Sequence, residues 1–414
     1  MDPGASQSRQ KALRICGLSV LAFLAMLSYS FARPATESLF LEAHTHDRLP
    51  VVWLLVAGAA VITVGAFARL LARYELLRLF GSTAGVSGLL LLALLASRNA
   101  GAPMVHYALY VWKDIYVVLL VETFYSFANT VFSIRSARWI FGGLGIASAL
   151  GSITGDFAVG VVAERWSTVV ALHVVPPLLF LIWAICIPLS RVAGAHLEVH
   201  RDPVPVRLTD TLRLLWRSSY VLLLLVLIML VQVVVTLIDY QYNQMVEQAF
   251  PDTDERTAII GRVYAAVSGA TLVLHALTGP TLHLVGVPAV LLAVPILLCG
   301  GTGALVALPR FLVAAVVKVA SKCFDYTVFR TAKEILYIPL SYAEKTQGKS
   351  FVDVMSYRVA KGGASLVLLV LGALGAGMLA GPLTVLVIAA WLGVTVVTVR
   401  RFRTKVSRRE EMGR

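Results

Sequence analysis

Charged residues are scarce in this chain. Asp, Glu, Lys and Arg make up 14% of its 414 residues, whereas a soluble domain usually carries about 25%. Hydrophobic residues make up 58%. A water-soluble fold could not bury that much apolar surface, but a bilayer supplies an apolar solvent for it. The composition therefore excludes a soluble protein and predicts one that is integral to a membrane.

Cysteine pairs and metal-ligand spacings are also missing. The 4 cysteines lie far apart in apolar stretches, and the 8 histidines form no ligand cluster. We interpret the cysteines as small buried hydrophobes, not as a disulfide framework or a metal site. The connections between apolar stretches are too short to build a catalytic cluster. We therefore expect no metal, no cofactor and no enzymatic activity.

Acidic residues are few. The chain has 23 Asp and Glu but 36 Lys and Arg, which gives a net charge of +13. The largest group of cations directly follows the last apolar stretch. Cytoplasmic anchors of membrane proteins lie at such places and contact anionic lipid headgroups. We therefore expect a lipid partner and no nucleic acid. The group consists of Arg400, Arg401, Arg403, Lys405, Arg408 and Arg409.

Long apolar runs are abundant, and a spanning helix needs about 20 mostly apolar residues. Twelve such runs predict an all-α membrane protein with twelve transmembrane helices. The first run has no small-residue cleavage site, so we interpret it as a retained helix and not as a signal peptide. The predicted spans are residues 12–33, 51–72, 76–97, 105–132, 139–162, 169–189, 220–240, 259–284, 287–308, 311–340, 351–378 and 383–399.

The longest polar connection, residues 191–217, contains Pro203 and Pro205 and separates six spans from six. It predicts an N-terminal bundle (1–190), a cytoplasmic linker (191–217), a C-terminal bundle (218–400) and a basic cytoplasmic tail (401–414). With the N-terminus inside, the inner loops hold most of the Lys and Arg, and the outer loops hold few cations and the acidic stretch 247–255. This asymmetry predicts a bacterial inner-membrane protein with both termini cytoplasmic.

The two predicted bundles resemble each other in sequence. Arg138 matches Arg358 within a Ser-x-Arg motif that precedes Gly-Gly, 220 residues later. Lys113 and the acid after it fall on Lys333 and the acid after it at the same offset. Parallel six-helix repeats are typical of the major-facilitator architecture. That architecture places a substrate site near the membrane midplane, between the halves.

Glycines are frequent in the fifth predicted span, where they would let helices approach closely. At the offset of 220 residues, Gly155 falls on Gly375. The segment is apolar and no Lys-Ser/Thr closes a phosphate-binding loop. We therefore assign the glycines Gly142, Gly143, Gly151, Gly155 and Gly160 to helix packing.

Ionisable residues inside the spans are the most informative signal. Each costs about 2.5–3.5 kcal/mol at mid-helix, so such residues persist only beside a cavity or a partner. They concentrate on the first, fourth, seventh and tenth spans, which line the central cavity of a major-facilitator protein. They are Arg33, Glu37, Lys113, Asp114, Glu122, Asp239, Lys318, Lys322, Asp325, Arg330, Lys333 and Glu334.

The tenth span is the most polar, and its spacing predicts one helical stripe. The stripe contains Lys318, Lys322, Phe329, Lys333 and Leu336. Cations on an apolar helix indicate an anionic substrate or buried acidic partners, and both interpretations stay open.

Salt bridges offer the simplest acidic partners, for example Lys333 with Asp239 or Asp114. Neighbours such as Lys113 and Asp114 point about 100° apart on a helix. One of them can therefore face a cavity while the other pairs with another helix.

Two stretches of the chain resemble a known family, the ATP/ADP translocases of plastids and obligate intracellular bacteria. The first reads Phe124-Tyr-Ser-Phe-Ala-Asn129, then Ala137-Arg138-Trp-Ile-Phe-Gly142. The second reads Phe324-Asp325, then Lys333-Glu334-Ile-Leu-Tyr-Ile-Pro-Leu340, Glu344-Lys345-Thr-Gln-Gly348-Lys349 and Arg358.

The resemblance implies a major-facilitator-like antiporter that exchanges nucleotides across a charged cavity. It implies that Lys333 is the family's tenth-helix lysine, Asp114 its fourth-helix acid and Asp239 its seventh-helix acid. Thr36 stands where the family has a first-helix lysine. The substrate therefore stays open between a nucleotide and another anion.

The expected substrate-binding residues combine cations for phosphate, acids for charge balance and aromatic rings that either stack a base or pack as anchors. Tyr240 is a further candidate for stacking. The predicted substrate contacts are Lys333, Arg330, Asp114, Asp239, Lys113, Arg33, Glu37, Trp112, Tyr110 and Asn129. The predicted gating ion pairs involve Glu334, Lys322, Asp325, Arg138 and Arg358.

The expected mechanism is alternating access of a monomer without ATP hydrolysis. Transport would be exchange, or it would be coupled to protons through Glu37, Asp114 or Glu122. Three alternatives remain: a carrier of a non-nucleotide metabolite or drug, a membrane-embedded enzyme, and a non-transporting helper or sensor.

Overall fold

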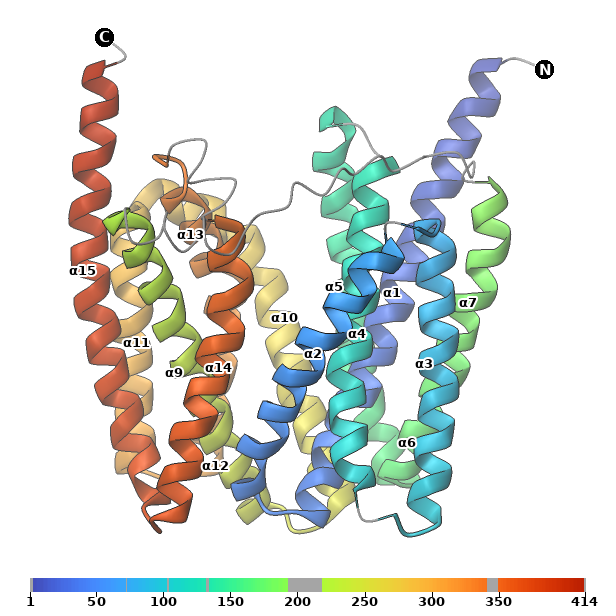
Figure 1. The fold of residues 1–414 in the computed structure, drawn as a ribbon, viewed down its shortest axis with the longest axis horizontal. Helices are drawn as coiled ribbons and strands as arrows, with labels where there is room; N and C mark the ends of the chain where they lie inside the picture. Colours follow the sequence, from blue (N-terminus) through green and yellow to red (C-terminus); the bar gives the residue numbers. More distant parts are fainter. Residues whose placement is uncertain are drawn as a thin grey trace. The chain divides into compact units, whose positions relative to one another are not determined.

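The computed structural model describes residues 3–71, 73–102, 104–131, 134–192, 218–340 and 349–412. These residues form helices joined by short connections, with no strand among them, so the all-α prediction is confirmed (Figure 1). The α-helices are α1 (Pro3–Ala43), α2 (Leu49–Leu71), α3 (Leu76–Asn99), α4 (Val105–Val131), α5 (Ile134–Arg165), α6 (Thr168–His173), α7 (Val175–Val192), α9 (Ser219–Ala249), α10 (Thr253–Val285), α11 (Val287–Ala307), α12 (Phe311–Phe324), α13 (Arg330–Leu336), α14 (Lys349–Ala373) and α15 (Ala380–Met412).

Nine of the described helical segments are, by length and composition, able to cross a membrane. Three predicted spans are not among these nine. They correspond to α4, to the segment from α12 to α13, and to α14. Charged residues lower the hydropathy of α4, and α12 by itself is only 14 residues long. The three segments that are too short or too polar to count as apolar spans thus hold most of the ionisable residues within the predicted spans.

Several helices extend beyond the predicted spans. Helix α1 runs through Pro34 as far as Ala43, because a proline removes one backbone donor while the flanking turns can stay helical. Helix α9 continues to Ala249, and α15 continues through the basic tail to Met412. Hydropathy falls before these helices end, so an apolar pattern underestimates their length.

The tenth predicted span is interrupted in the middle. Residues Asp325–Phe329 form a π-helical turn between α12 and α13, and such a turn changes the helical register that follows it. The continuous stripe from Lys318 to Leu336 is therefore wrong. Lys318 is buried beside Asp239, whereas Phe329 packs edge-on against Trp391 with ring centroids 5.9 Å apart.

Residue contacts divide the chain into two compact units. Unit 1 contains Met1–Thr45, Leu55–Asp202 and Phe250–Gly269; unit 2 contains His46–Leu54, Pro203–Ala249 and Ala270–Arg414. The first half of α10 thus belongs with the N-terminal helices, and the short segment after α1 belongs with the C-terminal ones. The predicted linker lies outside the described residues from residue 193 onward.

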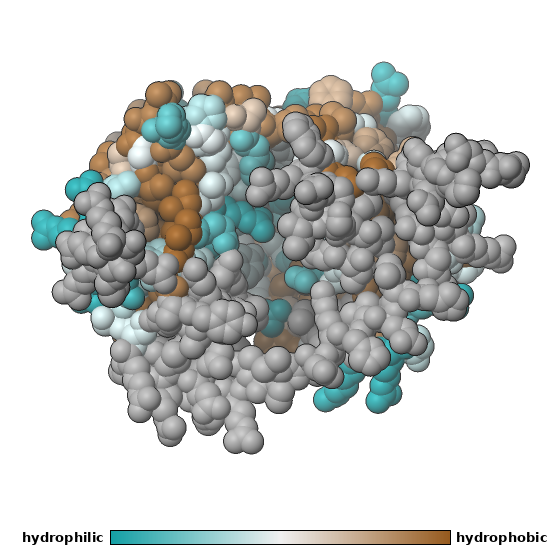
Figure 2. Space-filling model, turned by 90° about the horizontal axis from the view of Figure 1, so that it is seen from above, coloured by the Kyte–Doolittle hydropathy of each residue, from teal (hydrophilic) through white to brown (hydrophobic). Residues whose placement is uncertain are grey.

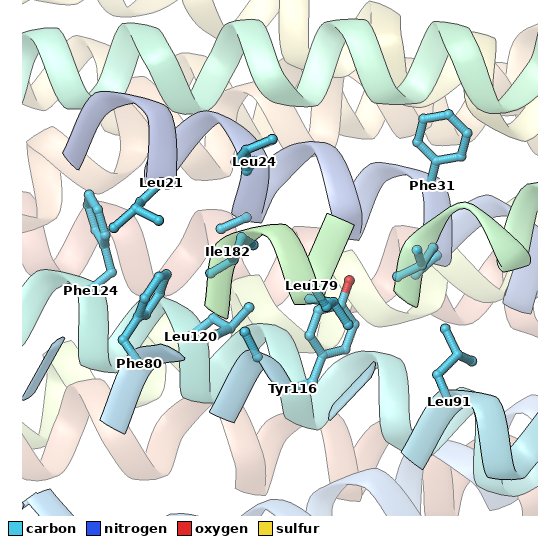
Figure 3. Close-up of a cluster of buried hydrophobic side chains, with 14 of the residues drawn as sticks. Leu21, Leu24, Phe31, Phe80, Leu91, Tyr116, Leu120, Phe124, Leu179 and Ile182 are labelled. Atoms are coloured by element: carbon cyan, nitrogen blue, oxygen red, sulfur yellow. The ribbon is translucent and has the colours of Figure 1, made fainter. Parts of the chain in front are cut away.

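The core of unit 1 is apolar and lies between α1, α3, α4 and α7. Figure 3 shows Leu21 of α1, Phe80 of α3, Phe124 of α4 and Ile182 of α7 in one buried cluster. All four residues are at most 6% exposed. This packing fixes the helices from which the polar side chains of unit 1 project.

Helices α1 and α5 approach closely because glycines line their contact. A Cβ atom at Gly155 would lie 2.8 Å from the carbonyl oxygen of Leu27, and one at Gly151 would collide with the backbone of Phe23. The packing role predicted for these glycines, and for Gly160 against Ala258, agrees with this geometry.

Two of the predicted packing glycines, Gly142 and Gly143, do not pack this way. A Cβ atom at either would meet no described atom within 4 Å, because both glycines are exposed. Gly375 is not equivalent to Gly155 either. It adopts φ +67° just after α14, where a left-handed residue favours glycine.

The outer sides of the helices expose large apolar residues. Leu89 and Leu90 of α3 are 61% and 50% exposed, and Ile296 and Leu297 of α11 are 54% and 58% exposed. Figure 2 looks along the helices and shows broad hydrophobic bands (brown) beside hydrophilic side chains (teal). Such exposure is unfavourable in water and typical of lipid-facing helices.

Candidate functional site

The ionisable side chains of unit 1 converge on Glu37. The phenolic hydroxyl of Tyr264 donates to Glu37 Oε2 at 2.9 Å. Arg33 Nε and Lys113 Nζ lie 3.7 and 3.6 Å from Glu37 Oε1. We call Arg33, Glu37, Lys113, Asp114 and Tyr264 the Glu37 cluster. It joins α1, α4 and the first half of α10.

Both cations of the Glu37 cluster have a second partner. Lys113 Nζ lies 2.8 Å from Asp114 Oδ1 and 3.7 Å from the centroid of the Tyr110 ring. The guanidinium carbon of Arg33 lies 3.3 Å from the centroid of the Tyr264 ring. Buried cations gain from carboxylates and aromatic faces together. Two cations and two acids leave this cluster formally neutral.

The sequence predicts that one of Lys113 and Asp114 can pair with another helix while the other faces a cavity. Lys113 does lie close to Glu37 of α1, but it also contacts Asp114. The flexible lysine stem lets the ammonium group reach back to its own neighbour.

Unit 2 has a smaller ionic site around Asp239. Lys318 Nζ lies 2.5 Å from Asp239 Oδ1, and Lys322 Nζ lies 2.9 Å from Asp239 Oδ2. The two lysines lie four residues apart on α12, which packs against α9. We call Asp239, Lys318 and Lys322 the Asp239 cluster. Its direct ion pairs give it two positive charges and one negative charge.

Exposure is uneven within the Asp239 cluster. The lysine side chains are 1% and 10% exposed, and the Asp239 side chain is 20% exposed. The carboxylate is thus the accessible partner and the two ammonium groups lie behind it. Asp239 pairs with these lysines, and not with the Lys333 named from the sequence.

The other charged residues of the tenth span lie at or beyond the π-helical turn. Asp325 accepts hydrogen bonds from Gln232 Nε2 at 3.3 and 3.5 Å. Lys333 is partly buried, while Arg330 and Glu334 are exposed. These residues follow the Asp239 cluster along the helix, and Lys322 of the cluster acts electrostatically on Asp325.

The aromatic candidates are mostly packed. Trp112 is 4% exposed, stacks on Tyr116 and donates from Nε1 to the carbonyl oxygen of Ser87. Tyr110 contacts Lys113, as described, and Tyr240 donates to Asp47 Oδ1 at 2.9 Å. The structure therefore places Trp112 in the core of unit 1 and ties the other two rings to polar partners.

Among the described side chains, two further candidates form no ion pair with either cluster. Glu122 is exposed on α4, and Arg358 is partly buried on α14. The side chains of Asn129 and Arg138 lie outside the described residues.

Sequence reasoning missed three polar residues near these sites: Tyr264, Gln232 and Asp156. Asp156 lies on α5, is 3% exposed and accepts a hydrogen bond from Ser268 Oγ at 3.1 Å. It is an acid in the middle of an apolar span, so the rule applied to the other acids would have found it. Tyr264 and Gln232 carry no charge and give no comparable signal.

The two clusters suit ion recognition without chemistry on the bound ion. Within the described ranges, no three His, Cys, Asp or Glu side chains are grouped as ligands for a metal ion. Charges buried in apolar helices are costly unless they are paired. Such pairs can be exchanged for a charged ligand at little net cost in desolvation.

Sequence comparisons connect the chain to transporters. The model of the TLC ATP/ADP transporter family matches residues 194–402, about half of the chain. The "ADP,ATP carrier protein 1" of Chlamydia trachomatis is 28% identical over 208 residues, which are 44% of this chain and 39% of that protein. The "Plastidic ATP/ADP-transporter" of Solanum tuberosum is 27% identical over 210 residues, 44% of this chain and 33% of that protein. The chain thus spans less than half the length of these relatives.

Solved structures share the fold. A mutant of the nucleoside transporter NupG matches with a TM-score of 0.68 at 11% identity, over 95% of this chain and 99% of that one. A bacterial homologue of the iron transporter ferroportin matches with a TM-score of 0.67 at 10% identity, over 94% and 98%. At such low identity the likeness concerns the fold alone. The family resemblance predicted from the sequence is confirmed by the family match.

Proposed function

The chain belongs to the TLC ATP/ADP transporter family, and from this premise we propose that it is a secondary carrier of an anionic, nucleotide-type substrate. In this proposal the carrier moves its substrate by alternating access and hydrolyses no ATP. The observation that supports the proposal most is the Asp239 cluster, in which two buried lysines share one carboxylate.

A phosphate group can take the place of Asp239 in that cluster. Asp239 binds one lysine with each of its carboxylate oxygens, and a phosphate offers the same arrangement of oxygens with more charge. Because Asp239 is the most exposed member, an incoming anion meets the carboxylate first and displaces it from the lysines. Asp239 is then the counter-ion of the unloaded carrier.

Further cations lie next along the same span. Lys333 and Arg330 on α13 would contact the remaining phosphate oxygens, and Lys333 is the position that the family resemblance assigns to the substrate. Asp325 and Glu334 would balance these cations. In unit 1, the Glu37 cluster would hold Arg33 and Lys113 in place.

We place the carrier in the bacterial inner membrane with both termini in the cytoplasm. The nine apolar segments, together with α4, the α12–α13 segment and α14, would make twelve crossings in two six-helix halves. The excess of Lys and Arg in the loops on one side supports this orientation.

Exchange in proteoliposomes tests the proposal. Vesicles loaded with unlabelled ADP receive labelled ATP, ADP, other nucleotides or a nucleoside outside, and initial uptake is measured. The wild type should take up at least one phosphorylated nucleotide and not the nucleoside. Lys318→Met combined with Lys322→Met should lower uptake about 100-fold, since two charge-assisted hydrogen bonds of about 1.5 kcal/mol each are lost.

The matched control is Arg78→Gln, which breaks an exposed ion pair with Glu75 at the start of α3. It should transport like the wild type. Uptake of no phosphorylated compound by the folded wild type would reject the nucleotide-type substrate. Equal uptake by the double lysine variant would reject the role of the Asp239 cluster.

A further inference from the structure

Asp156 is the one acid of the apolar α5 that is nearly fully buried and lies beside two hydroxyl groups. Ser268 Oγ of α10 donates to Asp156 Oδ2 at 3.1 Å, and Ser30 of α1 forms a side-chain hydrogen bond with the same carboxyl group. The group therefore lies where α1, α5 and α10 meet inside unit 1. No role has been given to it above.

The charges that face Asp156 are already engaged with one another. From α1, Arg33 and Glu37 act on it electrostatically. Arg33 pairs with Glu37 and stacks on Tyr264 of α10, and among the described residues no salt bridge reaches Asp156. Asp156 thus differs from Glu37 and Asp114, each of which has a lysine or an arginine within 4.0 Å.

The hydroxyl partners can accommodate both protonation states. A serine hydroxyl donates to a carboxylate, and the same oxygen accepts a hydrogen bond from a protonated carboxyl group. An arginine or lysine partner could not do this, because neither side chain accepts a hydrogen bond. Ser30 and Ser268 therefore allow a proton to bind and leave without breaking an ion pair.

The site also lies at a tight helix contact. A Cβ atom at Gly261 of α10 would lie 2.5 Å from the carbonyl oxygen of Asp156. A Cβ atom at Gly155 would lie 2.8 Å from the carbonyl oxygen of Leu27 in α1. A change of charge at Asp156 therefore acts at the point where three helices have no spare room.

We propose that Asp156 binds and releases the proton that couples transport to a proton gradient. This inference rests on the proposed carrier function and names its coupling ion. The carboxylate takes one proton from the side of higher proton concentration, becomes neutral, and releases the same proton on the other side. One positive charge thus accompanies the anionic substrate.

A proton fits this site better than a metal cation. One carboxyl group and two hydroxyls supply fewer oxygen ligands than a metal cation such as Ca²⁺ or Mg²⁺ usually takes, whereas a proton needs only one oxygen. The acids expected from the sequence fit less well, since Glu37 and Asp114 are held in ion pairs and Glu122 is exposed.

Infrared difference spectroscopy of the purified protein in lipid tests the site without any substrate. A pH titration of the wild type should show a carboxylic C=O band that appears on acidification, and Asp156→Asn should lack it. Ser268→Ala keeps the carboxyl group and should shift both the band and its pH midpoint. An identical titrating band in wild type and Asp156→Asn would overturn the proposal, whatever the protein transports.

Transport under an imposed pH gradient tests the coupling. Wild-type vesicles should accumulate the nucleotide when the proton gradient points in the direction of uptake, and a sodium gradient should have no effect. Asp156→Asn should lose this accumulation, and Asp156→Glu should regain part of it. The matched control is Arg262→Gln, which breaks an exposed ion pair with Glu164 between the same helices, α10 and α5. It should accumulate like the wild type.

The failures can be told apart. Absence of nucleotide uptake by the wild type together with a titrating Asp156 band would reject the proposed substrate and keep the proton site. Gradient-driven uptake that survives in Asp156→Asn, or that follows sodium, would reject Asp156 as the coupling group and keep the carrier.

Discussion

The Glu37 cluster of unit 1 and the Asp239 cluster of unit 2 share one arrangement and differ in their balance. In each, a single carboxylate lies within 4.0 Å of the charged nitrogens of two cations. In unit 1 the cations also contact Asp114, Tyr110 and Tyr264, so every charge is matched. In unit 2 the two lysines share Asp239 as their direct ion-pair partner.

Under the proposed function, this difference would distinguish a cluster that holds helices together from one that binds the substrate. A balanced buried network resists change, because removing one member leaves another charge without compensation. A carboxylate that two lysines share can be replaced by an anion that carries more charge. Under the proposed function, Glu37 would have a structural role and the cations of unit 2 would bind the substrate.

The largest expected effect is a loss of transport, caused by a substitution among the cations of unit 2. Lys333→Glu replaces a partly buried cation of α13 by an acid close enough to Asp325 to act on it. We expect uptake of an anionic substrate in proteoliposomes to be abolished, while folding and membrane insertion stay intact. Lys333→Arg keeps the charge and should retain most of the uptake. Unchanged uptake by the glutamate variant would remove Lys333 as a substrate contact.

The next largest effect is a loss of stability in unit 1. Glu37→Gln removes the carboxylate that Arg33 and Lys113 share, which should lower the free energy of unfolding by about 3–5 kcal/mol. Thermal unfolding in detergent measures the loss. Added nucleotide should not restore the stability, because the site has no surplus cation to offer. Restoration by nucleotide would mean that the Glu37 cluster is itself the anion site.

A smaller effect sharpens the contribution of Tyr264. Tyr264→Phe removes the hydrogen bond to Glu37 and keeps the ring beneath Arg33. We expect a destabilisation of about 2 kcal/mol, the range of a hydrogen bond to a charged group. Arg262→Gln, on the exposed surface of the same helix, should change stability by less than about 1 kcal/mol. Equal values for the two variants would argue against a tightly held network around Glu37.

Much of the fold was predictable from the sequence, because apolar runs of about 20 residues have few alternatives to a helix in lipid. The π-helical turn at Asp325–Phe329 was not. Its residues have no composition that distinguishes them from an α-helix, and its register is set by contacts such as Phe329 with Trp391.

The ionisable residues in the sequence indicated which helices carry polar clusters. They did not indicate which of these residues pair with one another. Arg33, Glu37 and Lys113 were recognised as buried ions, yet only their distances show that they form one cluster. Neutral partners such as Tyr264 and Gln232 could not be recognised from the sequence, since a tyrosine or a glutamine in a span is compatible with ordinary packing. Asp239 pairs with Lys318 and Lys322 of α12 and not with Lys333, because of the way the helices are rotated about their axes. No spacing rule in the sequence predicts this rotation.

The central claim is that Asp239 is a counter-ion which the substrate replaces. Nucleotide affinity of the wild type and of Asp239→Asn, measured by calorimetry on the purified proteins, tests it most directly. The account predicts that the asparagine variant binds a phosphorylated nucleotide about tenfold more tightly, a gain of about 1.4 kcal/mol from freed lysines. Weaker or unchanged binding by the folded variant would contradict it.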